Sequence, residues 1–226
     1  SGVLTIYGFS GVSILILAAL IAAIYAAAYG YTLEKIAYRP LRNAPRLSPL
    51  ISAIGMSLFL QNYVLLAQTP DFLPFPALIP DFDFMEPIAH IMGSPELVIL
   101  VTSAVSMVAL TVLIKYTRIG KAMRATQQDM TMARLVGVNV DNVISMTFVI
   151  GSVLAAIGGV LVGSYIGQIN FYIGFMAGVK AFTAAVLGGI GNIPGAVLGA
   201  LVLGLTEAYA AGYISSAYED VFAFGV

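Results

Sequence analysis

Long, nearly continuous apolar runs dominate the chain, and short polar stretches separate them. The runs cover residues 9–31, 48–67, 96–116, 143–166, 171–190 and 195–212. Most are close to the roughly 20 residues that an α-helix needs to cross a bilayer. A transmembrane β-barrel would instead show alternating polarity in segments of roughly 10 residues. The pattern therefore predicts an all-α fold, a polytopic helical membrane bundle with six full spans.

Composition supports a membrane protein, because 60% of the residues are hydrophobic and only 9% are charged, far from the averages of soluble domains. A seventh apolar run starts at Val221 but stops at Val226, and the first residue is Ser1 rather than a methionine. The chain is thus expected to be a piece of a longer protein, incomplete at both ends. Residues 1–226 are expected to form a single transmembrane domain.

The basic residues gather in two loops. Nine of the ten Lys and Arg residues follow the first or the third run, at positions 35, 39, 42, 46, 115, 118, 121, 124 and 134. An excess of positive charge marks the cytoplasmic side of a membrane protein. The segment 47–114 has no Lys or Arg but carries five acidic residues, so its polar part is predicted to lie outside.

The outer loop, residues 68–95, holds six of the ten prolines. Proline fixes φ and lacks an N–H, so a stiff, irregular excursion is expected here. It either offers a docking surface to an extracytoplasmic partner or is a plain connector. The loop also holds His90, the single histidine, which argues against a histidine-based metal or nucleophile site.

The inner loop, residues 117–142, contains an amphipathic pattern over 121–136 that predicts one short helix. Gly137 can end this helix in the left-handed conformation, and Asn139, Asp141 or Asn142 can cap the next span. A half-apolar helix on the cytoplasmic face has two candidate binding partners. One is the lipid headgroup region, and the other is a groove on a cytoplasmic protein.

Small residues form a stripe on the fourth run. They recur at four-residue spacing, at Gly151, Ala155, Gly159 and Gly163. Such a stripe allows close helix packing in a membrane, where lipid supplies no hydrophobic drive for association. Packing inside one bundle accounts for each glycine taken singly.

Two charged residues interrupt the later runs. Lys180 is predicted at membrane depth, where an isolated charge costs about 2.5–3.5 kcal/mol or more. Glu207, in the sixth run, is the carboxylate that can reach it if the two helices are neighbours. The two residues either form a pair that pins the helices or line a polar solute path. Gln61 and Asn62 in the second run also have two interpretations. They either form hydrogen bonds between helices or belong to the solute path.

Enzymatic motifs are absent from the sequence. There is no G-x-x-x-x-G-K-[ST] phosphate loop, and no histidine or aspartate lies in the apolar runs, as an intramembrane protease would need. No catalytic residue, metal site or cofactor of this chain is therefore predicted. The remaining choice lies between a carrier or channel that works alone and a permease driven by a separate ATPase.

Three blocks of the sequence resemble the membrane permeases of bacterial branched-chain amino acid ABC importers, the Liv type. The blocks are YRPLRNAPRLSPLISAIGMSLFLQNYV at 38–64, RATQQDMTMARLVGVNVDNVISMTFVIGSVLAAIGGVL at 124–161 and NFYIGFMAGVKAFTAAVLGGIGNIPGAVLGALVLGLTEA at 170–208. The similarity covers nearly all of the chain after Ile24 and weakens in the proline-rich loop.

The resemblance implies a multi-pass permease of the bacterial inner membrane that works by alternating access. Its implied partners are a homologous permease subunit, two cytoplasmic ATPases that carry ATP and Mg, a periplasmic binding protein and the lipid bilayer, with no nucleic acid. The segment 117–142 corresponds to the family's coupling region. Its implied coupling residues are Arg124, Asp129, Ala133, Arg134, Gly137 and Asn139. Thr131 and Met132 stand where importers often have an acidic residue, so the general coupling motif is degenerate and the family-specific LVGVN carries the match.

The resemblance leaves the solute open. Related permeases differ in substrate, so urea or a short aliphatic amide is an alternative to branched-chain amino acids within the same architecture. An ATP-independent secondary carrier or channel is the alternative from a different class.

Overall fold

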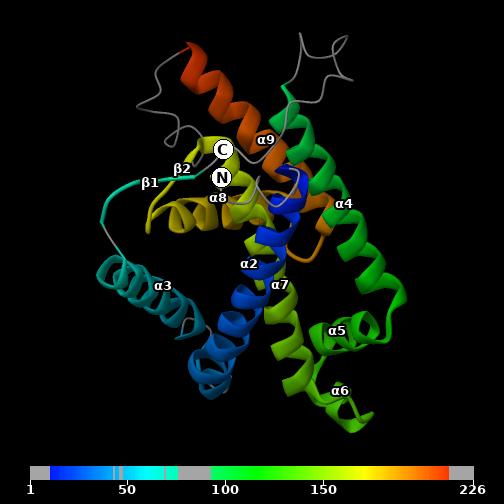
Figure 1. Cartoon of the computed structure of the whole chain (residues 1–226). Helices are drawn as coiled ribbons and strands as arrows, with labels where there is room; N and C mark the ends of the chain where they lie inside the picture. The colour runs from blue at the N-terminus through cyan, green and yellow to red at the C-terminus, as the bar shows by residue number, and fades with distance from the viewer. Residues whose placement is uncertain (1–10, 43, 46–47, 69, 76–92, 214–226) are drawn as a thin grey trace. The chain divides into compact units, whose positions relative to one another are not determined.

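The computed structural model describes residues 11–42, 44–45, 48–68, 70–75 and 93–213, and these fold almost entirely into α-helices (Figure 1). The long helices are α2 (Gly11–Leu33), α3 (Ser48–Ala67), α4 (Ser94–Tyr116), α7 (Val140–Ile166), α8 (Ile173–Leu187) and α9 (Ile193–Tyr213). Two shorter helices, α5 (Arg118–Gln128) and α6 (Met130–Leu135), connect α4 to α7. The helices begin and end within a few residues of the predicted apolar runs, which confirms the all-α prediction.

The predicted count of six full spans is not confirmed. Within the described residues, four helical stretches are long and apolar enough to cross a membrane, namely Ser13–Leu41, Pro95–Tyr116, Val140–Ile166 and Ile193–Tyr213. The other two apolar helices are shorter, and α8, with 15 residues, extends only about 22 Å at 1.5 Å per residue. A bilayer core is about 30 Å thick. The predicted start of a seventh span and most of the outer loop, with His90, lie outside the described residues.

Two compact units divide the chain, residues 1–171 and 172–226. In the first unit, α2 and α7 pack along each other, as Figure 1 shows. The two helices approach closely at Gly30, because a Cβ added there would lie 2.8 Å from the Cβ of Ser152 and would overlap its hydroxyl. The ring of Tyr38 packs against that of Phe148, with centroids 4.9 Å apart. These two contacts fix the register between α2 and α7.

The end of α2 departs from α-helical geometry. A π-helix, η1 (Glu34–Tyr38), follows directly, and then a short 3₁₀ helix, η2 (Arg39–Leu41). In the π turn the N–H of Arg39 donates to the carbonyl of Glu34, five residues earlier. Such wide turns are rare and occur often at functional sites.

A two-stranded sheet ties the segment after α3 to the end of α7. β1 (Leu73–Pro74) pairs antiparallel with β2 (Gln168–Ile169), with Leu73 opposite Ile169, and the N–H of Phe75 adds a 2.9 Å bond to the carbonyl of Gly167. Gly167 ends α7 at φ +75°, in the left-handed region that favours glycine. The start of the proline-rich loop is therefore more regular than the sequence predicted.

The second unit contains the helical hairpin of α8 and α9. Ala184 and Leu203, each 5% exposed, meet in its core. The turn places Gly189 and Gly191 at φ +92° and +93°, values that other residues adopt only at a cost. A Cβ on Gly188 or Gly195 would overlap the backbone of the other residue. Glycines in this turn thus serve both its conformation and the close approach of the two helices.

Large apolar side chains remain exposed along these helices, including Ile24 at 72%, Val105 at 61% and Leu198 at 62%. A soluble monomer rarely exposes so much contiguous apolar surface. In a bilayer these side chains face lipid or neighbouring spans, so the surface matches a multi-pass membrane protein.

Candidate functional site

The segment between α4 and α7 turns back sharply at Thr117. Its hydroxyl accepts the N–H of Gly120 at 3.0 Å and caps α5, while it donates to the carbonyl of Leu113 at 2.6 Å. Gly120 is buried, and a Cβ there would overlap the carbonyl of Ile114. The guanidinium of Arg124 donates to that same carbonyl. The sequence-predicted residue Arg124 therefore holds α5 against the C-terminal turn of α4.

The prediction of one continuous helix over 121–136 is wrong. Asp129 adopts an extended conformation, with φ −155° and ψ 111°, and separates α5 from α6. Its carboxylate accepts the N–H groups of Thr131 at 2.7 Å and Met132 at 3.0 Å. A short acidic side chain competes with the helical backbone for such donors and favours the N-cap position over the helix interior. Amphipathic periodicity alone does not reveal this competition.

Gly137 ends α6 as the sequence predicted. It has φ +86°, its N–H donates to the carbonyl of Arg134 at 3.0 Å, and the next N–H, of Val138, reaches the carbonyl of Ala133 at 2.9 Å. This pair of bonds is the Schellman motif. Asn139 then caps α7 by accepting the N–H of Asn142 at 3.2 Å. Of the three predicted candidates for this cap, Asn139 takes the position.

The elbow between α6 and α7 has a buried inner side and an apolar outer side. Ala133 and Val140 are each 2% exposed and form the inner side. The outer side consists of four large apolar residues that are at least half exposed, namely Met130, Met132, Leu135 and Val136. We call these four residues the elbow surface. Capping by Asp129, Gly137 and Asn139 gives it a fixed shape.

Sequence reasoning missed a network of charges beside the elbow. Asp141, in the first turn of α7, pairs with Arg42, with Arg39 at 3.1 Å and with Arg134 at 3.9 Å. Arg42 pairs at the same time with Glu34, which is only 1% exposed. These five residues are called the charge network below.

A signal for the network was present in the sequence. Glu34 directly follows the first apolar run and precedes Arg42 by eight residues, in a loop that is otherwise basic. Its partner Arg42 also pairs with Asp141, which lies about a hundred residues further along the chain, and no local pattern connects these residues. The sequence could therefore mark Glu34 as unusual but could not show its partners.

Lys180 and Glu207 form an ion pair between α8 and α9. Their side chains are 30% and 21% exposed, so the pair is neither fully buried nor free in solvent. The other two polar residues predicted for a solute path satisfy part of their hydrogen bonding within α3. Gln61 donates to the hydroxyl of Ser57 at 3.2 Å, and Asn62 donates to the carbonyl of Leu58 at 2.8 Å.

The small-residue stripe of α7 has two environments. Gly163 is buried, and a Cβ there would lie 3.2 Å from the side chain of Ile169. Gly151, Ala155 and Gly159 are exposed, and among the described residues nothing lies within 4 Å of a Cβ built on either glycine.

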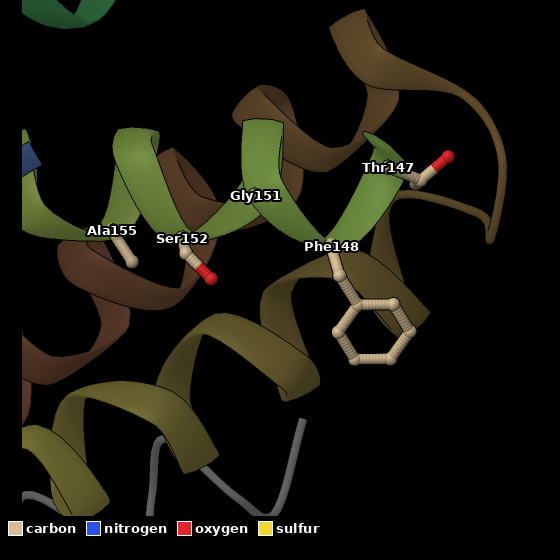
Figure 2. A pocket seen from close by; sticks show the side chains of 5 residues that line it. All are labelled: Thr147, Phe148, Gly151, Ser152 and Ala155. Carbon is tan, nitrogen blue, oxygen red and sulfur yellow. The ribbon is translucent and has the colours of Figure 1, made fainter. Parts of the chain in front are cut away.

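A hollow of about 370 Å³ runs along α7 beside the exposed part of the stripe. It is lined by Thr147, Phe148, Gly151, Ser152 and Ala155, and Figure 2 shows that Phe148 and Ser152 point to the same side of the helix. The hollow lacks charged groups, so its lining offers van der Waals contact rather than ion binding.

No candidate metal site emerges from the part of the chain that the structure describes. There, no group of three or more His, Cys, Asp or Glu residues is placed to hold a metal ion. Within the described residues, the five members of the charge network and the Lys180–Glu207 pair are joined in ion pairs.

Comparison with known proteins identifies similar sequences over almost the whole chain. The family model described as branched-chain amino acid transport system / permease component matches residues 2–226. The high-affinity branched-chain amino acid transport system permease protein LivH of Escherichia coli K12 is 50% identical over 208 residues, which cover 91% of this chain and 68% of LivH. The corresponding protein BraD of Pseudomonas aeruginosa is 48% identical over 227 residues, 99% of this chain and 74% of BraD.

More distant similarity extends to another transport system. The autoinducer 2 import system permease protein LsrC of Yersinia enterocolitica is 36% identical over 102 residues, 42% of this chain and 28% of LsrC. No solved structure matches the chain.

Proposed function

Because the chain belongs to the family of branched-chain amino acid transport permease components, we propose that it is the membrane-spanning subunit of an ATP-driven importer in the bacterial inner membrane. Branched-chain amino acids are the proposed solute. They would be delivered by a periplasmic binding protein and translocated together with a homologous permease subunit. The observation that carries this proposal is the 50% identity to LivH over 91% of the chain.

Energy for transport would come from two cytoplasmic ATPases that bind ATP and Mg. This division of labour is supported by the sequence, because the chain lacks a phosphate-binding G-x-x-x-x-G-K-[ST] loop of its own. The permease would supply no covalent chemistry. Its part would be to exchange an inward opening for an outward one when the ATPases close and separate.

The elbow surface is the proposed docking site for an ATPase. An exposed helical face with four large apolar side chains fits a hydrophobic groove on a partner protein. Its fixed shape favours tight docking, because little conformational freedom is lost on binding. Asp129, Gly137 and Asn139 would act by holding this shape, and Arg124 would connect it to α4. Ala133 would allow α6 to pack closely on α7.

The Lys180–Glu207 pair is proposed to lie beside the solute path. An amino acid carries one ammonium and one carboxylate group, so it can exchange partners with an ion pair without leaving a net charge in the membrane. Urea and simple amides have no such charges. Gln61 and Asn62 are proposed as neutral polar groups of the same path. The exposed part of the α7 stripe, Gly151 to Gly159, is proposed for packing against another span.

The proposal is tested by uptake of labelled leucine into proteoliposomes. They would contain the intact protein, its candidate permease partner, the two ATPases and the binding protein, with and without internal ATP. Uptake that requires both ATP and binding protein is expected. Leucine flux without ATP would instead indicate a secondary carrier or channel. ATP hydrolysis stimulated by the binding protein with transport of urea or an amide would overturn the solute and keep the architecture.

A further inference from the structure

The charge network lies where three parts of the first unit meet. Glu34 belongs to η1 at the end of α2, Asp141 to the first turn of α7, and Arg134 to α6 in the elbow. Arg39 and Arg42 come from the segment after η1. The proposed function above uses the elbow as a docking site but assigns nothing to Glu34, Arg39, Arg42 or Asp141.

Exposure rises from one end of the network to the other. The side chain of Glu34 is 1% exposed, that of Arg42 17%, Asp141 38% and Arg134 61%. Glu34 is held firmly, because Arg42 pairs with it and the hydroxyl of Ser145 in α7 donates to it at 2.5 Å. Arg134 is held loosely, since it lies 3.9 Å from Asp141. The network thus has a buried, tightly held end at η1 and an exposed, loosely held end in the elbow.

Positive groups outnumber negative groups in this network. Three guanidinium groups share two carboxylates, and Asp141 serves all three of them. Arg42 and Arg134 approach the same oxygen of Asp141, Oδ1. A closer contact between Arg134 and Asp141 would therefore weaken the ion pair between Asp141 and Arg42. Because an unpaired buried charge is costly, Arg42 and Glu34 would have to adjust together.

The helix that carries Glu34 is built to accept such an adjustment. Glu34 starts the π turn, in which one residue more than usual fits between hydrogen-bonded groups. A π turn can relax to α-helical geometry by shifting the register of the residues that follow. Packing of Tyr38 on Phe148 would transmit that shift to the α2–α7 interface.

From this arrangement we infer that Glu34, Arg42 and Asp141 are positioning residues that transmit movement of the elbow to α2. Movement of the elbow acts first on Arg134, and the resulting change in helix geometry occurs in the π turn. The inference rests on the proposed function, since it requires a partner that moves the elbow. It differs from a purely structural role, in which the ion pairs hold α2, α6 and α7 in one fixed arrangement throughout the transport cycle.

The first experiment measures ATP hydrolysed per leucine transported in the complete reconstituted importer. Asp141→Asn keeps the size of the side chain but removes its charge. Hydrolysis is expected to stay within about a factor of two, while uptake falls by about tenfold, a typical coupling between sites. Asp141→Glu should restore most of the uptake. The matched control is Arg118→Gln, which removes an exposed charge of α5 that makes no ion pair with any of the residues that the structure describes.

The second experiment follows the movement itself. Because the chain has no cysteine, spin labels can be introduced at Ile36, 67% exposed in η1, and Tyr165, 56% exposed at the far end of α7. Their distance distribution is expected to change when ATP is added to the assembled importer. In the Asp141→Asn background this change should disappear although ATP still binds.

Two results would overturn the inference while leaving the proposed function intact. One is an unchanged ratio of hydrolysis to uptake in Asp141→Asn, whether both activities are normal or both fall together. The other is an ATP-dependent distance change that is the same in the variant and in the wild type. A wild-type importer without ATP-dependent uptake would overturn the proposed function, and the inference with it.

Discussion

Gly199 of α9 lies directly against the carbonyl oxygen of Ala184 in α8, so closely that a methyl group on Gly199 would overlap it. The same methyl group would lie 2.9 Å from the backbone nitrogen of Gly188. Backbone atoms cannot move aside as a flexible side chain can. The hairpin of the second unit therefore depends on the absence of a side chain at this position.

Replacing Gly199 by alanine is expected to destabilise the hairpin. Overpacking of this kind costs about 1–3 kcal/mol, more than the 0.5–1 kcal/mol, roughly, that alanine gains over glycine within a helix. The measurement is the thermal loss of helical circular dichroism in detergent. Gly204→Ala on the same helix is the control, because no atom of the described ranges lies within 4 Å of a Cβ there. Equal melting temperatures for the two variants would contradict the close packing.

Neutralising one member of the Lys180–Glu207 pair should be worse for the fold than neutralising both. Lys180→Met leaves Glu207 uncompensated in the membrane, at a cost of about 2.5–3.5 kcal/mol. The double variant Lys180→Met/Glu207→Met removes both charges, and replacement of an ion pair by apolar residues is often neutral. Thermal unfolding of both variants in detergent checks this order of stability.

Measurement of leucine uptake distinguishes between the two proposed roles of the Lys180–Glu207 pair. If it lies beside the solute path, the double variant should fold normally and transport leucine at least about tenfold more slowly, a loss of roughly 1.4 kcal/mol of interaction with the solute. If it only pins the helices, the double variant should transport at the wild-type rate. A stable double variant with normal uptake would therefore remove Lys180 and Glu207 from the path.

Gly137 should tolerate asparagine but not valine. At φ +86°, asparagine is among the few residues that adopt the left-handed region readily, whereas a β-branched residue is a genuine outlier there. Gly137→Val is expected to distort the elbow and to uncouple ATP hydrolysis from uptake, while the protein still inserts in the membrane. Gly137→Asn should retain most of the uptake. Comparable transport by both variants would show that the conformation of Gly137 has no part in coupling.

A charge on the elbow surface should weaken binding of the ATPase. Leu135 is 76% exposed, and burial of a leucine at an interface contributes about 1.5–3 kcal/mol. Leu135→Glu is expected to reduce the affinity for the ATPase by about tenfold or more, since every 1.4 kcal/mol is about tenfold. Binding to the purified ATPase in detergent measures this. Gln127→Ala, at an exposed polar position of α5, is the control and should bind normally.

The sequence predicted the helices well, because long apolar runs have few ways to satisfy their backbone in a membrane. It also identified Gly137 as the end of α6 and Asn139 as a candidate cap of α7, because capping depends on the local chain alone. The break at Asp129 was missed, since the amphipathic pattern continues through it and only the cap geometry reveals the interruption. The strand pair was missed as well, because Leu73 and Ile169 lie far apart in the sequence.

Partners of the charged residues were the least accessible to sequence reasoning. Lys180 and Glu207 could be matched because each interrupts an apolar run and the two runs are consecutive. For Asp141 the sequence suggested only a capping role, as one of three candidates for the N-cap of α7. Its pairing with Arg39 and Arg42 depends on the packing of α2 against α7, which no local pattern encodes.

Burial of Glu34 limits how this position can change during evolution. A carboxylate that is 1% exposed and paired with Arg42 cannot be lost alone without leaving a partly buried guanidinium less well compensated. Loss of Arg42 alone leaves the buried carboxylate of Glu34 without its ion-pair partner. Among related permeases, the two positions are therefore expected to covary, with both charges kept or both replaced. Sequences in which only one of the two has changed should be rare, and they should carry a compensating change near Ser145.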